Sequence, residues 1–90
     1  MEEAVHIYFS GRVQGVGFRF TARFLASKHN IKGWVKNLID GRVELFAQAE
    51  TKKILSFLDA LRREFKGYIV DEEIEWVKPQ IEEQGFTIRF

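Results

Sequence analysis

Apolar and polar residues alternate with a period of two along the first part of the chain, and this pattern predicts a strand with one buried face. The apolar residues of this segment are Val5, Ile7, Phe9 and Val13. From residue 18 the apolar residues instead follow the period of an amphipathic helix. One side of this predicted helix carries Phe18, Ala22, Leu25, Ala26 and His29. We expect the helix to end near Asn30 and Gly33.

A hairpin is expected next. Trp34, Val35 and Leu38 suggest a second strand. The dipeptide Asp40-Gly41 is a strong turn signal, because these residues adopt left-handed backbone angles readily. The apolar residues of the returning strand are Val43, Leu45, Ala47 and Ala49.

A second amphipathic helix and two further strands complete the pattern. The helix is indicated by apolar residues at helical spacing, namely Ile54, Phe57, Leu58, Leu61 and Phe65. Gly67 is expected to end it. A strand of alternating apolar and acidic residues then runs to Pro79, which cannot donate to a sheet ladder. A short last strand is expected over Phe86–Phe90.

The element order is β-α-β-β-α-β with an additional C-terminal strand. This order predicts an α+β fold, the ferredoxin-like split βαβ sandwich, with two helices on one face of a mostly antiparallel sheet. Both βαβ crossovers should be right-handed. No linker or low-complexity segment interrupts the pattern, so residues 1–90 are expected to form a single domain. The fold alone does not specify a function.

Composition narrows the classes of function. The formal net charge is only +1, so no global basic field attracts nucleic acid or membrane. The chain has no cysteine, which excludes disulfides, thiolate zinc sites and a cysteine nucleophile. We find no signal-peptide pattern and no apolar run near the ~18 residues that a membrane span needs. We therefore expect a cytoplasmic protein without membrane contact.

A cluster of glycines marks the junction between the first strand and the first helix. Gly11, Gly15 and Gly17 fall within seven residues, and Arg19 follows in the first turn of the predicted helix. Glycines let successive backbone N–H groups converge, and the positive end of a helix adds to such an anion site. Arg19 could hold two oxygens of the same anion, phosphate being the natural ligand. Spacing alone fits equally well with a tight turn beside a solvated arginine.

Known phosphate-binding motifs do not match this junction. After Gly15 and Gly17 the dinucleotide-binding fingerprint requires a third glycine, where this chain has Phe20. The Gly-Lys-Ser/Thr ending of a nucleotide-binding P-loop is absent as well.

An RNA-binding sheet of the same fold is disfavoured. That module stacks bases on aromatic residues in the middle of an inner strand, whereas Phe18 and Phe20 are expected at the start of a helix. The acidic residues at positions 71, 72, 73 and 75 would also repel a phosphate backbone. We therefore expect no nucleic-acid partner.

A second segment, "KGWVKNLIDGRVE", contains Asn37 just before the predicted hairpin turn. Taken alone, this asparagine fits an ordinary turn residue. Taken together with "GRVQGVGFR", it identifies a resemblance to the acylphosphatases, small enzymes that hydrolyse the carboxyl–phosphate bond of acyl phosphates. The first motif matches at Gly11, Val13, Gln14, Gly15, Val16, Phe18 and Arg19. The second matches at Gly33, Trp34, Val35, Asn37, Gly41 and Val43.

The resemblance implies a metal-independent hydrolase whose catalytic residues are Arg19 and Asn37. Phosphate would be bound by Arg19 and by the backbone of the loop, comprising Gln14, Gly15, Val16, Gly17 and Phe18. Asn37 would orient the attacking water. The substrate would be a small acyl phosphate, no cofactor would be needed, and the protein is expected to be a monomer. Two features depart from the family pattern: Ala49 replaces a usual glycine, and residues 66–77 lack a usual proline-containing entry.

Other chemistry is less well supported by the sequence. His6 and His29 share no spacing, and Ser10 has no base beside it in the sequence, so neither general-base nor covalent catalysis is indicated. No group of residues has metal-ligand spacing. Two alternatives remain open at this point. One is a non-catalytic module that binds phosphate or a phosphorylated metabolite; the other is an acylphosphatase-like domain of a larger hydrogenase-maturation or carbamoyl-transfer protein.

Overall fold

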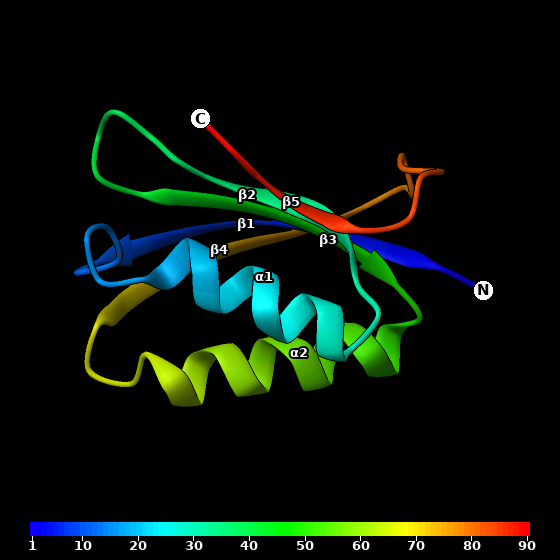
Figure 1. The fold of residues 1–90 in the computed structure, drawn as a ribbon, viewed down its shortest axis with the longest axis horizontal. Coiled ribbons are helices and arrows are strands. Elements are labelled where there is room, and N and C mark those ends of the chain that lie inside the picture. The colour runs from blue at the N-terminus through cyan, green and yellow to red at the C-terminus, as the bar shows by residue number, and fades with distance from the viewer.

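A computed structural model describes residues 1–90 and contains five strands and two helices. In chain order the elements are β1 (Glu3–Gly11), α1 (Phe18–Lys28), β2 (Lys32–Asn37), β3 (Val43–Ala49), α2 (Thr51–Glu64), β4 (Ile69–Val77) and β5 (Phe86–Arg89). The strands form one sheet in the order β4-β1-β3-β2-β5, and both helices cover the same face of it (Figure 1). Only the β2–β5 pair is parallel. The predicted fold class is confirmed.

The core lies between the sheet and the helices. Val5, Ile7 and Phe9 of β1 point into it, as their alternation predicted. The two helices contribute Phe18, Ala22, Ala26, Ile54, Phe57, Leu58 and Leu61. Val13 lies beyond the end of β1, in the connection to α1, and its side chain is nevertheless only 1% exposed. This anchored valine fixes the path of the loop that leads to the candidate site.

The end of α1 differs in detail from the sequence prediction. The helix ends at Lys28, and Asn30 adopts a left-handed conformation with φ 57°. Gly33 does not end the helix, because it belongs to β2. A Cβ atom added to Gly33 would lie 1.9 Å from the carbonyl oxygen of Phe46, so close packing of two strands requires glycine here.

The face of the sheet opposite the helices carries several aromatic side chains. Tyr8, Trp34 and Phe46 lie there, in the middle of three inner strands. The argument against an RNA-binding sheet considered only Phe18 and Phe20, and it was wrong to take their position at a helix start as a lack of aromatic residues in the inner strands. Phe46 is only 4% exposed, and the guanidinium of Arg89 lies 4.4 Å from the centre of the Trp34 ring.

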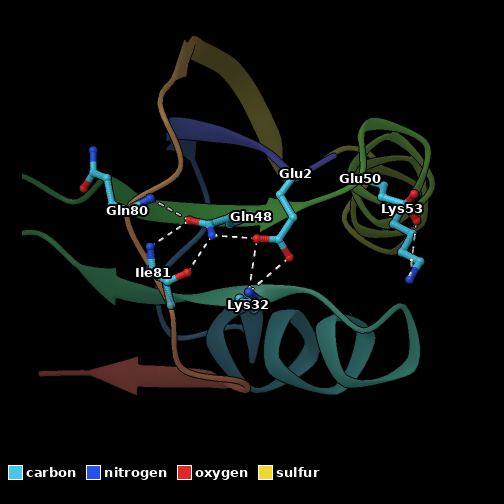
Figure 2. Close-up of polar contacts among 7 residues, drawn as sticks. All are labelled: Glu2, Lys32, Gln48, Glu50, Lys53, Gln80 and Ile81. Atoms are coloured by element: carbon cyan, nitrogen blue, oxygen red, sulfur yellow. Dashed lines mark hydrogen bonds and ion pairs between the residues drawn. The ribbon is translucent and has the colours of Figure 1, made fainter.

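The end of the sheet that holds the start of β1 is stabilised by a polar network around Gln48 (Figure 2). The Gln48 amide donates to a carboxylate oxygen of Glu2 at 2.9 Å and to the carbonyl of Ile81 at 2.6 Å. Its oxygen accepts from the backbone N–H groups of Gln80 and Ile81. Lys32 pairs with Glu2 at 3.1 Å. The hydrogen bond from Gln48, then that from Lys32, lower the pKa of Glu2. The network thus fastens the connection between β4 and β5 to the sheet.

β4 is an edge strand, and most of its side chains are exposed to solvent. Glu72 is an exception, because Arg62 of α2 donates to both of its carboxylate oxygens, at 2.8 to 3.1 Å. This contact holds the C-terminal half of α2 close to the edge strand. Neither helix is long and apolar enough to cross a lipid bilayer.

Candidate active site

Two connections lie at the same end of the molecule: residues 12–17 between β1 and α1, and residues 38–42 between β2 and β3 (Figure 1). Both follow the C-terminal ends of strands that run in the same direction, since each pairs antiparallel with β3. The topology therefore brings the two sequence motifs to one edge of the sheet.

The connection after β1 has the backbone geometry of an anion cradle. Gly15 and Gly17 both adopt left-handed conformations, with φ 74° and 81°. Gly17 is the N-cap of α1, where no side chain caps the free N–H groups and no acidic residue lies in the first turn. Left-handed backbone at these positions favours glycine strongly, and it turns N–H groups toward a common point. The first turn of α1 therefore presents donors that an anion can satisfy.

Arg19 lies in this first turn, as predicted. Its side chain is half-buried, and it forms no ion pair or hydrogen bond with another residue of the chain. Its guanidinium lies 5.4 Å from the centre of the Phe90 ring. Phe90 reaches this place because β5 runs parallel to β2 and so carries the C-terminus toward the candidate site. The guanidinium donors of Arg19 thus remain available to a ligand.

Asn37 is the last residue of β2 and pairs with Val43 across the hairpin. Its side-chain oxygen Oδ1 is buried and has no hydrogen-bond partner in the chain. An orphaned buried acceptor is uncommon and calls for an explanation such as a catalytic role or an ordered water. The simple turn interpretation does not supply one, since a turn asparagine bonds neighbouring backbone.

Gln14 has a side-chain contact that the sequence did not reveal. Its Nε2 atom donates to the carbonyl oxygens of Leu38 at 2.8 Å and of Arg42 at 2.9 Å. The loop after β1 is therefore hydrogen-bonded directly to the hairpin that follows Asn37. No local pattern could have shown this contact, because its partners are 24 and 28 residues away along the chain.

The hairpin is also closed by Asp40. This carboxylate accepts from the backbone N–H of Arg42 at 3.1 Å and from its side-chain Nε at 2.9 Å. The backbone hydrogen bond, followed by the side-chain one, lowers the pKa of Asp40. Gly41 adopts φ 95°, as the Asp-Gly turn signal predicted.

Comparison with known proteins decides the family. The Acylphosphatase family profile matches residues 5–88. The chain belongs to the acylphosphatase family. It is 42% identical to the acylphosphatase of Roseiflexus sp. (strain RS-1) over 86 residues, which cover 92% of this chain and 90% of the relative.

Solved structures give the same family and fold. The crystal structure of acylphosphatase from Bacillus subtilis superposes with a TM-score of 0.89 at 34% identity, and the match covers the whole of both chains. Full-length HypF, in a phosphate- and nucleotide-bound form, matches with a TM-score of 0.82 at 28% identity. That match covers all of this chain but only 12% of HypF. The fold therefore occurs both as a chain of this length and as part of a larger protein.

Family membership makes this acylphosphatase an enzyme that hydrolyses small-molecule acyl phosphates. The prediction drawn from the two motifs is confirmed, and hydrolysis is supported over the alternative of a non-catalytic phosphate-binding module. No group of three or more His, Cys, Asp or Glu side chains in this acylphosphatase is arranged to hold a metal ion.

The remaining candidate residues of this acylphosphatase lie elsewhere. The Nε2 atom of His6 lies 2.7 Å from a carboxylate oxygen of Glu44, on the face of the sheet opposite the helices. Tyr8 also donates to Glu44, and burial, followed by the Glu44 charge, raises its pKa. Phe18 belongs to the core. Phe20 is 62% exposed on α1.

Proposed function

We propose that this acylphosphatase works by direct attack of water on phosphorus, with Arg19 and Asn37 as the catalytic residues. The observation that carries the proposal is a pair of unused polar groups at one end of the sheet. These are the unpaired guanidinium of Arg19, beside an uncapped helix N-terminus, and the orphaned Oδ1 of Asn37. An anion would satisfy the donors, and a water molecule would satisfy the acceptor.

The phosphoryl group is bound by the loop and by Arg19. Backbone N–H groups of Gln14, Gly15, Val16, Gly17 and Phe18 donate to its oxygens, because the left-handed glycines turn them inward. Arg19 adds a charge-assisted pair of hydrogen bonds that strengthens as charge shifts during transfer. Phosphoryl transfer needs mainly positioning and electrostatic stabilisation, so these few groups are sufficient.

Asn37 orients the nucleophile. Its Oδ1 accepts a hydrogen bond from water and directs the water lone pair at phosphorus. The bond from phosphorus to the acyl oxygen breaks, and the carboxylate departs with the electron pair. Both protons of the water remain on the phosphate product, so a dianionic acyl phosphate gives a carboxylate and dihydrogen phosphate. A carboxylate is a good leaving group, and therefore no strong general acid and no metal ion are required.

Isotope labelling tests this route. Benzoyl phosphate is hydrolysed by the wild-type protein in ¹⁸O-water with a metal chelator present. We expect undiminished turnover, with the label in phosphate and none in benzoate. Label in benzoate would show attack at the carbonyl carbon and refute water attack on phosphorus, and loss of turnover with chelator would refute metal independence.

We also propose that the domain spans residues 1–90 and acts as a monomer in the cytoplasm without a nucleic-acid partner. The acidic edge strand supports the monomer, because Asp71, Glu73 and Glu75 would repel a second copy of the same edge. On the face of the sheet opposite the helices, Glu44 and the acidic residues of β4 disfavour a phosphate backbone beside the partly buried rings of Tyr8 and Trp34. Sedimentation equilibrium, with and without single-stranded RNA, tests the monomeric state and the absence of a nucleic-acid partner. A mass above that of one chain, or co-sedimenting RNA, would contradict them.

A further inference from the structure

The side chain of Gln14 has a position that phosphate binding by the loop does not explain. The residue belongs to the loop, yet both N–H bonds of its carboxamide point at the hairpin after β2. Since both donors are used within the chain, its side chain has none left for a phosphate oxygen. Its contribution to the reaction, apart from its backbone N–H, must therefore pass through the hairpin.

The two acceptors are the carbonyls that close the hairpin. The Leu38 carbonyl also accepts from the N–H of Gly41 at 3.2 Å, and the Arg42 carbonyl accepts from the N–H of Leu38 at 2.8 Å. Gln14 is the second donor to each of them. The Gln14 side chain thus holds both sides of the turn, and one of its two acceptor residues, Leu38, directly follows Asn37.

The other end of Gln14 is equally well placed. Its backbone directly precedes Gly15, whose left-handed conformation begins the anion cradle. Movement of the hairpin relative to Gln14 would therefore change the distance between bound phosphate and the Asn37 amide. A misplacement of about 1 Å between reacting groups costs on the order of 100-fold in rate.

We propose that the Gln14 side chain is a positioning residue that fixes Asn37 and its water relative to phosphate held in the loop. This inference rests on the roles proposed above for Asn37 and the loop. Gln14 Nε2 restrains the hairpin, the hairpin restrains Asn37, and the water is held on line with phosphorus.

A double-mutant cycle tests the coupling. Initial rates of benzoyl phosphate hydrolysis and the inhibition constant of inorganic phosphate are measured for the wild type, Gln14→Met, Asn37→Ala and the double variant. Gln14→Met keeps the backbone N–H and the approximate volume but removes both donors. Gln84→Met is the matched control, because Gln84 is exposed and its side chain forms no hydrogen bond. Thermal unfolding confirms that each variant is folded at the assay temperature.

We expect Gln14→Met to lower kcat by roughly 10- to 100-fold. The phosphate inhibition constant should change less than about threefold, because the loop donors remain. In the Asn37→Ala background, the same change should lower kcat less than about threefold, since the residue being positioned is already missing. Gln84→Met should behave as wild type.

Contrary results separate this inference from the mechanism beneath it. An equal loss of kcat from Gln14→Met in both backgrounds, or no loss in either, would refute positioning through Asn37 and leave the proposed mechanism standing. Wild-type kcat in Asn37→Ala would instead refute the role of Asn37 itself.

Gln14→Glu gives a second test should the methionine variant not fold. Its carboxylate has no donor at neutral pH, and protonation restores one. Its kcat relative to wild type should therefore recover as the pH falls. A constant ratio across the same pH range would refute the proposal.

Discussion

Gln48 permits a test that separates the stability of the fold from the chemistry of the site. It is only 2% exposed and belongs to the polar network shown in Figure 2. It pairs with Ala4 near the start of β1, whereas the two site loops follow the ends of β1 and β2. Replacing it by leucine removes four hydrogen bonds, to Glu2, to the backbone N–H of Gln80 and to both backbone groups of Ile81. We expect a less stable protein with unchanged kcat.

The size of the loss follows from these contacts. Each net hydrogen bond contributes about 1 kcal/mol, so a simple sum gives roughly 4 kcal/mol. The backbone groups of Gln80 and Ile81 lie in an exposed or half-exposed segment, where water can replace part of the lost bonding. Leucine also gains from burial. We therefore expect a loss of about 2–3 kcal/mol, which lowers Tm by roughly 10–20 °C in a domain of this size.

Thermal unfolding followed by circular dichroism measures this loss, and kcat is measured well below both transitions. Gln80→Leu is the matched control, since Gln80 contributes only its backbone N–H to the network, and its Tm should stay near that of the wild type. A Tm change of less than about 2 °C in Gln48→Leu would refute the stabilising role of the network. A tenfold or greater loss of kcat would refute the independence of the two ends.

Three further predictions concern the site itself. Gly17→Ala should weaken phosphate inhibition severalfold, because a residue with a side chain is strained by about 1 kcal/mol at the φ of 81° that Gly17 adopts. Gly85→Ala is the control: Gly85 has a φ of 103°, so the substitution should cause similar strain but leave phosphate inhibition unchanged. Asp40 has a lowered pKa, so its stabilisation of the hairpin is present above the unfolded pKa and is lost as the pH falls through the folded pKa. The protection of the amides in residues 38–42, measured relative to their intrinsic exchange rates, should fall over that range, and Asp40→Asn should abolish this change. Deleting Phe90 should raise the phosphate inhibition constant about two- to fivefold, the value of a cation–π contact to Arg19. An unchanged constant would show that the ring does not hold the guanidinium.

Much of the fold was predictable because its elements have local causes. The change from a period of two to a helical period located the start of α1 at Phe18, and Asn30 marked its end to within two residues. The Asp40-Gly41 turn fixed the hairpin, since left-handed backbone is readable from residue type alone. Gly33 misled the prediction, because glycine marks both helix ends and places where strands approach closely, and only the partner strand distinguishes these cases.

The placement of the candidate residues was predictable from the sequence, but the contacts between their segments were not. Arg19 and the glycines lie in one short segment, so their shared location is a local property. The contact of Gln14 with the hairpin and that of Arg19 with Phe90 depend on strand order, which brings together segments far apart in the sequence. The contact of His6 with Glu44 was not predicted for the same reason, because these residues are far apart in the sequence.

The central claim is that Arg19 binds and stabilises phosphate whereas Asn37 acts only on water. The most direct measurement compares kcat and the phosphate inhibition constant in Arg19→Ala and Asn37→Ala. Arg19→Ala should lose at least ~10²–10³ in kcat and also bind phosphate more weakly. Asn37→Ala should lose kcat while its phosphate inhibition constant stays nearly that of the wild type. Equal loss of phosphate affinity in both variants would contradict this division of roles.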